Sequence, residues 1–205
     1  MIVVGITGSI GMGKTTVARF FADEGVPVWS ADEAVHRLYS AGEAGAEAIA
    51  RLVPEAVGSH SVDRARLRQA MVEDPCLFER VEAVIHPLVA ADRDAFLERA
   101  RAAGEPVAVC EIPLLFETGA DRWLDRVIVV TAPPRVQRQR VLSRAGIDAA
   151  GFEALLARQL SDEEKRARAD FIIDTAGSKE ATRAQVRALL ARLRAEARAR
   201  RDDDA

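Results

Sequence analysis

The sequence lacks asparagine altogether and has only two cysteines, one tyrosine and three lysines among its 205 residues. Without asparagine the chain cannot carry the N-K-x-D motif that reads guanine in GTPases. Cys76 and Cys110 show neither metal-ligand spacing nor a disulfide framework, and we expect both to be small buried apolar residues. No apolar run approaches the roughly 18 residues of a membrane span, so we expect no membrane partner. The N-terminus also lacks the basic region and cleavage site of a signal peptide, which predicts a cytoplasmic protein.

The charge of the chain is balanced rather than strongly of one sign. Its 29 basic and 32 acidic residues give a formal net charge of −3 at pH 7. A surface that binds nucleic acid through its phosphates needs concentrated positive charge, so we expect no nucleic-acid partner. The length fits one domain with insertions, and we expect a monomer or a weak homo-oligomer.

Five short apolar runs predict β-strands, and most of them are separated by segments with helical periodicity. The first, IVVGIT, is apolar on both faces, which is typical of a central parallel strand. The predicted strands are residues 2–7, 26–29, 106–112, 126–132 and 170–175. This pattern predicts an α/β fold with a five-stranded parallel sheet, in which ligands bind beyond the carboxyl ends of the strands.

Helical segments fill the intervals between these strands. Residues 13–25 and 178–201 predict amphipathic helices that pack on the core. Their inward positions are Val17, Phe20, Phe21, Val186, Leu189, Leu190 and Leu193. Residues 32–104 contain several helical stretches punctuated by proline and glycine, which predicts a helical insertion after the second strand. A second, arginine-rich insertion follows the fourth strand.

The segment GITGSIGMGKTTVARF, residues 5–20, contains the phosphate-loop pattern G-x-x-x-x-G-K-[ST]. In such a loop main-chain N–H groups surround phosphate oxygens at a helix N-terminus, and glycines permit the close backbone approach. Lys14 supplies a compact ammonium to the terminal phosphates, and Thr15 offers its hydroxyl to Mg²⁺. The residues expected to bind the nucleotide are Gly8, Gly11, Met12, Gly13, Lys14, Thr15 and Thr16.

A phosphate loop alone does not separate a GTPase switch, a motor-type ATPase and a small-molecule kinase. The segment FIIDTAG, residues 171–177, is similar to the D-x-x-G switch motif of GTPases. It comes far along the chain, however, and only one helix follows it, which leaves no room for the remaining GTPase strands. We interpret Asp174 as a strand-end or turn residue.

Asp32 favours the kinase interpretation because it follows the second strand, where a carboxylate can accept the proton of an attacking hydroxyl. The alternative is that Ser30 or Asp32 caps the helix that begins in SADEAVHRLY. The two roles are compatible, and we favour the catalytic base.

The arginines of RVQRQRVLSR, residues 135–144, predict a lid over the transferred phosphoryl group. Arg138, Arg140 and Arg144 lie on one predicted helical segment, and Arg140 and Arg144, four residues apart, share one helix face. The alternative for each of them is an ion pair at the surface.

An ordered set of segments resembles the dephospho-CoA kinase family, whose members phosphorylate the 3′-hydroxyl of the dephospho-CoA ribose with ATP. The likeness covers nearly the whole chain, and its HP and PLLFE segments are the most specific. The segments are GITGSIGMGKTTVA, SADEAVHRLY, VDRARL, VEAVIHPLV, EIPLLFETG, DRVIVVTAPPRVQRQRVLSR and RQLSDEEKRARADFIIDTAG.

The resemblance implies a P-loop NTPase-type three-layer fold in a single domain, residues 1–205. The implied parts are a nucleotide-binding core at 1–31, 105–134 and 168–201, a helical CoA-substrate insertion at 32–104 and a lid at 135–167. It also implies ATP and dephospho-CoA as substrates and Mg²⁺ as cofactor. The alternative is another small P-loop kinase that acts on a nucleoside or alcohol acceptor.

Individual residues match motifs of the family. Asp32 falls on its catalytic aspartate. Arg140 and Arg144 match a Q-x-x-R-x-x-x-R lid pattern that begins at Gln137, while Arg138 lies at a free position. These matches imply a catalytic group of Asp32, Lys14, Arg140 and Arg144.

Further matches concern the acceptor and the metal. Arg64 and His86 match the substrate-side motifs; by itself His86, before Pro87, reads as a helix-start residue. Glu111 stands where the family frequently has aspartate, and we expect it to join Thr15 near the metal.

Overall fold

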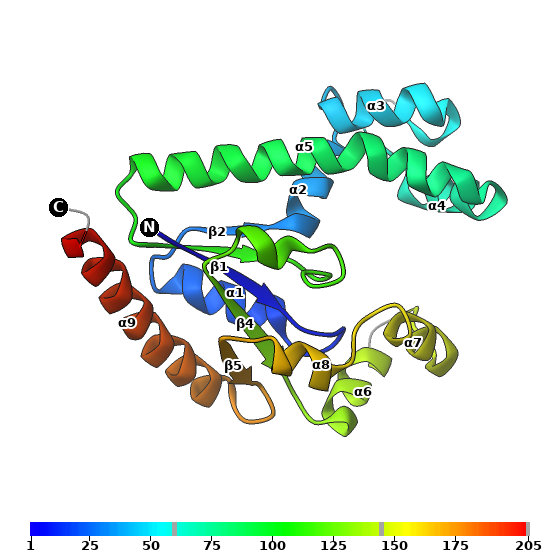
Figure 1. The fold of residues 1–205 in the computed structure, drawn as a ribbon. Helices are drawn as coiled ribbons and strands as arrows, with labels where there is room; N and C mark the ends of the chain where they lie inside the picture. Colours follow the sequence, from blue (N-terminus) through cyan, green and yellow to red (C-terminus); the bar gives the residue numbers. More distant parts are fainter. Residues whose placement is uncertain (59–60, 144–145, 204–205) are drawn as a thin grey trace. The chain divides into compact units, whose positions relative to one another are not determined.

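The computed structural model describes residues 1–58, 61–143 and 146–203 (Figure 1). Two compact units divide the chain: Met1–Val28 with Ala100–Ala205, here called the core unit, and Trp29–Arg99, the helical unit.

The described strands form one five-stranded sheet in the order β2-β3-β1-β4-β5. They are β1 (Ile2–Thr7), β2 (Val28–Ser30), β3 (Val107–Glu111), β4 (Arg126–Thr131) and β5 (Phe171–Asp174). β1 pairs in parallel with β3 and β4, and β4 pairs in parallel with β5. The predicted α/β fold with a parallel five-stranded sheet is therefore confirmed, although β2 lies later than the predicted 26–29.

The register of the sheet brings polar strand ends to one edge. Ile6 lies opposite Glu111 in β3, Thr7 opposite Val129 in β4, and Thr131 opposite Asp174 in β5. All residues of β1 and β3 are buried, because side chains cover both faces of the sheet. The polar side chains of the sheet that could take part in a reaction therefore lie at the strand ends.

Helices of the core unit surround this sheet. They are α1 (Lys14–Asp23), η2 (Ala120–Trp123), α6 (Pro134–Leu142), α7 (Ala149–Leu156), α8 (Asp162–Ala167) and α9 (Lys179–Asp203). α1 and α9 pack against each other beside the sheet (Figure 1). The long α5 (Pro75–Ala102) begins in the helical unit and ends in the core unit.

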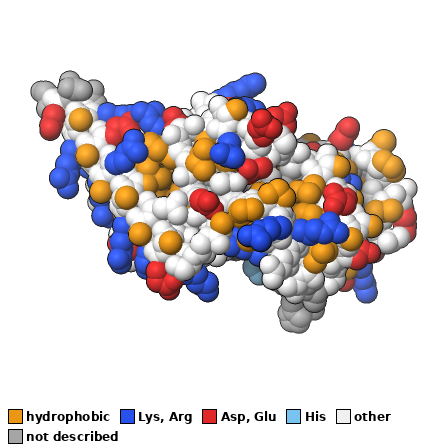
Figure 2. All heavy atoms as spheres, turned by 90° about the horizontal axis from the view of Figure 1, so that it is seen from below, with side chains coloured by type: hydrophobic (Ala, Val, Ile, Leu, Met, Phe, Trp, Pro, Cys, Tyr) orange, Lys and Arg blue, Asp and Glu red, His pale blue; other side chains and the backbone are white. Residues whose placement is uncertain are grey.

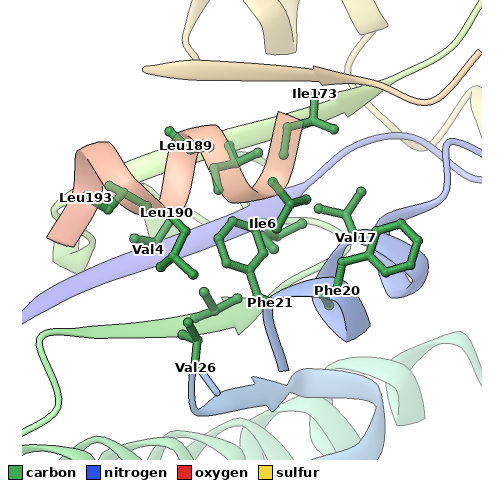
Figure 3. Packing of buried hydrophobic residues seen from close by; sticks show 14 of the residues in the cluster. Val4, Ile6, Val17, Phe20, Phe21, Val26, Ile173, Leu189, Leu190 and Leu193 are labelled. Carbon is green, nitrogen blue, oxygen red and sulfur yellow. The ribbon is translucent and has the colours of Figure 1, made fainter. Parts of the chain in front are cut away.

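The main hydrophobic core lies between the sheet and these two helices. Figure 3 shows Leu190 of α9 beside Val4 of β1, and Phe21 of α1 beside Ile6 of the same strand. Every inward position predicted for the two helices is buried. α1 ends just before Gly25, whose N–H donates to the carbonyl O of Ala22 and whose φ is 80°.

Adjacent isoleucines of β5 give a test of this core. Ile173 is 1% exposed in the core, whereas Ile172, on the opposite face of the strand, is 45% exposed. We expect Ile173→Val to lower the free energy of unfolding by about 0.5–1.5 kcal/mol, because one buried methylene is removed. Ile172→Val keeps the β-branched shape and should change it by much less. Urea unfolding of both variants measures the difference, and equal effects would contradict this packing.

The helical unit contains α2 (Ala31–Leu38), α3 (Ala44–Leu52), η1 (Pro54–Ala56), α4 (Arg64–Glu73) and most of α5. It has its own hydrophobic core, to which Ile49, Leu67 and Ile85 contribute. Asp92 of α5 accepts hydrogen bonds from Trp29 Nε1 and Arg37 Nη2, both at 2.7 Å. These bonds tie α5 to the beginning of the unit.

Two expectations from the sequence are wrong in this unit. α5 runs through Pro87, so His86 lies within the helix instead of at its start. Proline removes one hydrogen bond to the carbonyl four residues earlier, but Ala83 and Pro87 are both exposed, so water can satisfy that carbonyl while Ile85 anchors the helix. Cys76 is exposed rather than buried, because it lies in the first turn of α5; Cys110 is buried as expected.

No helix in the described part of the chain has the length and apolar character needed to cross a membrane. On the face drawn in Figure 2, lysine and arginine side chains alternate with aspartate, glutamate and hydrophobic groups. That face shows no continuous region of one charge.

Candidate active site

The phosphate loop, residues 8–13, joins the end of β1 to the start of α1. Gly8, Gly11 and Gly13 all have positive φ, and Gly13, with φ 94°, is the left-handed N-cap of α1. A side chain would strain this N-cap conformation. Because Gly13 has no side chain to cap the helix, the first turn of α1 presents its amides and the positive end of its dipole to an anion.

Lys14, the first residue of α1, folds back over this loop. Its Nζ donates hydrogen bonds to the carbonyl O of Gly8 at 2.8 Å and to that of Ser9 at 3.3 Å. These contacts place the ammonium beside the loop main chain. The flexible lysine stem allows the ammonium to move from carbonyl to phosphate oxygens, which a planar guanidinium would do less readily.

Thr15 and Glu111, the residues assigned to a metal from the sequence, are in contact. Thr15 Oγ1 donates to Glu111 Oε1 at 2.7 Å, and Glu111, the last residue of β3, is 6% exposed. Both supply oxygen, the donor that Mg²⁺ prefers, and Mg²⁺ usually combines one or two protein oxygens with phosphate and water. Within the described residues no cluster of three or more His, Cys, Asp or Glu could hold a metal by itself. The pair therefore fits a Mg²⁺ ion that arrives with a nucleotide.

Met12 participates through its main chain rather than its side chain. The side chain is 1% exposed, and its Sδ accepts a hydrogen bond from Ala132 N at 3.1 Å. Its carbonyl O accepts from Thr175 Oγ1 at 2.7 Å. The loop is thus anchored to the ends of β4 and β5.

A cavity of about 370 Å³ lies beside the loop in the core unit. It is lined by Gly11, Gly13, Thr16, Arg140, Ser143, Thr175, Gly177, Lys179 and Thr182. Arg140 is held at its wall, donating from Nη1 to Thr175 Oγ1 at 2.8 Å and from Nη2 to Thr175 O at 2.5 Å. Arg144 lies outside the described residues. Arg138 instead forms a surface ion pair with Glu153 at 2.9 Å, the alternative considered above.

Five residues of this wall receive no nucleotide role from the sequence pattern: Ser143, Thr175, Gly177, Lys179 and Thr182. Asp174 is a strand-end residue, one of the two roles expected: it ends β5, and its Oδ1 accepts a hydrogen bond from Ala176 N at 2.7 Å. The signal for its neighbours was the rule that the carboxyl ends of parallel strands share one edge. Applied to β5, that rule points directly to Thr175.

The predicted acceptor-side residues all belong to the helical unit. Asp32 is exposed in the first turn of α2, after Ser30, the N-cap, whose side chain makes no capping hydrogen bond. Arg64 begins α4, with its guanidinium carbon 5.7 Å from the centre of the Tyr39 ring. Burial raises the pKa of Tyr39, and the charge of Arg64 partly opposes this shift. His86 is exposed, with Nε2 3.8 Å from Glu82.

A buried ion pair joins the loop after β3 to α8. Lys165 Nζ lies 2.9 Å from Glu117 Oε1, and the lysine side chain is fully buried. Burial opposes ionisation of Glu117, but its interaction with Lys165 and the hydrogen bond from Leu160 N outweigh burial and hold the pKa of Glu117 below its usual value. One of the three lysines, Lys165, therefore has a structural role, in which it ties α8 to the loop after β3.

The sheet, the loop at the end of β1 and the lysine folded over it define a class. The chain is an α/β protein of the P-loop type, with a site for nucleoside phosphates at the carboxyl edge of the sheet. Comparison with known sequences places it more narrowly. A sequence model of the dephospho-CoA kinases matches residues 2–181, and the chain belongs to the dephospho-CoA kinase family.

The sequences of known relatives match this chain over nearly its full length. A dephospho-CoA kinase from Mesorhizobium japonicum is 55% identical over 194 residues, which cover 95% of this chain and 98% of that protein. One from Cereibacter sphaeroides is 53% identical over 191 residues, 93% of this chain and 95% of that protein. A crystal structure from Thermus thermophilus has a TM-score of 0.78 at 37% identity, covering 94% of this chain and 97% of that chain. The family predicted from the sequence is confirmed.

Proposed function

We propose that the protein transfers the γ-phosphoryl group of ATP to the 3′-hydroxyl of the dephospho-CoA ribose, giving coenzyme A and ADP. The observation that carries this proposal is the half-identical, full-length match to dephospho-CoA kinases, combined with an intact phosphate loop. The alternative of a different nucleoside or alcohol acceptor is not favoured, because these matches extend through the helical segments as well as the loop.

The core unit is proposed to bind the nucleotide. The amides of residues 8–16 surround the phosphates, and Lys14 bears on the β- and γ-oxygens. The 370 Å³ cavity, which adjoins Gly11, Gly13 and Thr16, would take the nucleoside; its size lies in the ordinary range of small-molecule sites, about 300–1,000 Å³. Arg140 and Arg144 are proposed to meet the negative charge of the nucleotide from the segment 135–167.

Thr15 and Glu111 are the residues proposed to hold Mg²⁺, since their oxygens already lie in contact. When bound, the ion would neutralise charge on the phosphate oxygens. Glu111 in its present position accepts the Thr15 hydroxyl hydrogen and so fixes the direction of the Oγ1 lone pairs.

Asp32 is proposed to accept the proton of the 3′-hydroxyl as its oxygen bonds to the γ-phosphorus. The bond from that phosphorus to the bridging oxygen breaks, and ADP leaves with the bonding electrons. Arg64 and His86 are proposed to bind the acceptor. A cytoplasmic location and a monomer or weak homo-oligomer remain predictions.

ADP release measured against a set of acceptors tests this function. We expect release with dephospho-CoA and little with AMP or without an acceptor. The 3′-deoxy analogue of dephospho-CoA should bind but not react, because it lacks the attacking oxygen. ADP release that proceeds equally with the deoxy analogue, or slow GTP hydrolysis that no acceptor stimulates, would contradict the proposal.

A further inference from the structure

The two peptide groups that flank Ile10 in the phosphate loop are each held by a glutamine side chain. Ile10 N donates to Gln159 Oε1 at 3.1 Å, and Gln137 Nε2 donates to Ile10 O at 2.8 Å. Gln137 belongs to α6, and Gln159 lies between α7 and α8. Because an amide N–H can only donate and a carbonyl can only accept, the main chain fixes which end of each glutamine faces it.

Gln137 is placed for this contact by close packing rather than by chance at a surface. It is 6% exposed, and a Cβ added to Gly11 would lie 2.6 Å from Val141 Cγ2 and 3.1 Å from Gln137 O. Glycine at position 11 thus lets the loop lie directly on α6. A buried amide that lost Ile10 O would leave polar groups unsatisfied on both sides.

These bonds set the direction of the phosphate-binding amides. In a trans peptide the C=O of Ile10 and the N–H of Gly11 point in opposite directions. A carbonyl held on α6 by Gln137 therefore turns the Gly11 amide away from α6. Thr175 acts in the same way on the next peptide but one, because its hydroxyl holds Met12 O and so orients the Gly13 amide.

The same geometric relation applies to the peptide between Ser9 and Ile10. Its N–H points out to Gln159, so the Ser9 carbonyl of the same peptide points the other way, where it accepts from Met12 N at 3.2 Å and Lys14 Nζ at 3.3 Å. Gln159 thereby helps to place the acceptor that holds the Lys14 ammonium beside the loop.

We propose that Gln137 and Gln159 are positioning residues that hold the two peptide groups flanking Ile10 and thereby orient the amides and the ammonium that bind ATP phosphates. This inference rests on the proposed function, in which the loop binds ATP. It assigns to two side chains outside the loop a part of the ATP affinity.

Isosteric replacements test the proposal. Gln137→Met and Gln159→Met keep the side-chain length but remove the hydrogen bond. We expect each to weaken Mg²⁺·ATP binding by about tenfold, as the loss of one partly buried hydrogen bond implies. The KM for dephospho-CoA should stay near the parent value. Gln139→Met is the matched control, because Gln139 is exposed on the same helix.

Glutamate at each position separates positioning from packing. At 159 a carboxylate can still accept from Ile10 N, whereas at 137 it cannot donate to Ile10 O and repels it. Both variants add one negative charge beside the main chain of Ile10, so this charge alone does not distinguish them. We therefore expect Gln159→Glu to bind ATP at least about fivefold more tightly than Gln137→Glu. A purely structural role would give no such order.

Calorimetry with Mg²⁺·ATP, thermal unfolding and steady-state kinetics supply the readouts. ATP affinities of both methionine variants within twofold of Gln139→Met would overturn the proposal, as would equal affinities of the two glutamate variants. Failure of the proposed function has a different signature, since the parent protein itself would then show no dependence on dephospho-CoA.

Discussion

Replacing Lys14 by alanine is expected to lower kcat by about 10³-fold or more, the scale on which charge clamps act in phosphoryl transfer. The ammonium lies against the loop carbonyls of Gly8 and Ser9, the point from which it can follow negative charge onto the γ-phosphoryl oxygens. Alanine removes one of the positive groups proposed to oppose that charge in the transition state. Rapid-quench measurement of ADP formation with saturating ATP and dephospho-CoA gives the chemical rate directly.

Two further variants test whether the fall in kcat comes from this specific contact. Arg19→Ala removes an exposed cation from the same helix and should leave kcat unchanged, which separates a specific contact from general electrostatics. Lys14→Arg retains the charge but not the compact ammonium, and it should recover little of the lost rate. Near-parental turnover in Lys14→Ala would remove this residue from the catalytic group.

The sheet was predictable because its strands are continuous apolar runs buried on both faces. β1 and β3 show this most clearly, since every residue in them is buried. β2 is displaced from its predicted place because it has only three residues, too few to carry a period. The two amphipathic helices were predictable because one face of each meets the sheet.

Pro87 shows where a local rule fails. Proline disfavours a helix interior by about 3 kcal/mol, which predicts a boundary there. In α5 the residues around it are divided between a buried side, with Val81 and Ile85, and an exposed side that carries Ala83 and Pro87. Packing of the buried side of α5 outweighs the cost of proline in the helix. A short stretch of sequence around Pro87 does not show this, because the packing involves the whole helix.

The site was partly predictable, and which residues could be predicted depends on the kind of contact that each one makes. Residues that need a special backbone or a particular side chain, such as Gly13, Lys14 and Thr15, form a recognisable pattern. The contact of Thr15 with Glu111 follows because the end of β3 and the first turn of the helix after β1 lie at one edge of the sheet. Gln137 and Thr175 were not assigned roles because they bind main-chain atoms, and main-chain groups are the same at every position.

Replacing Asp32, the proposed catalytic base, is expected to have the other large effect. Asp32→Asn keeps the shape of the side chain but removes its ability to accept a proton at neutral pH, so kcat should fall by about 10²- to 10⁴-fold. The KM values for ATP and dephospho-CoA should change little, because an amide can still accept a hydrogen bond from the 3′-hydroxyl.

Glu33 supplies a matched control for this variant, because it is an exposed carboxylate in the same first turn of α2. Glu33→Gln removes the same charge from the helix N-terminus and alters its dipole interaction equally. A loss of kcat confined to Asp32→Asn therefore identifies proton transfer rather than helix electrostatics as the cause. If Asp32→Asn retains most of the parental kcat, the carboxylate serves only the helix, and the hydroxyl proton must leave by way of the phosphate or water.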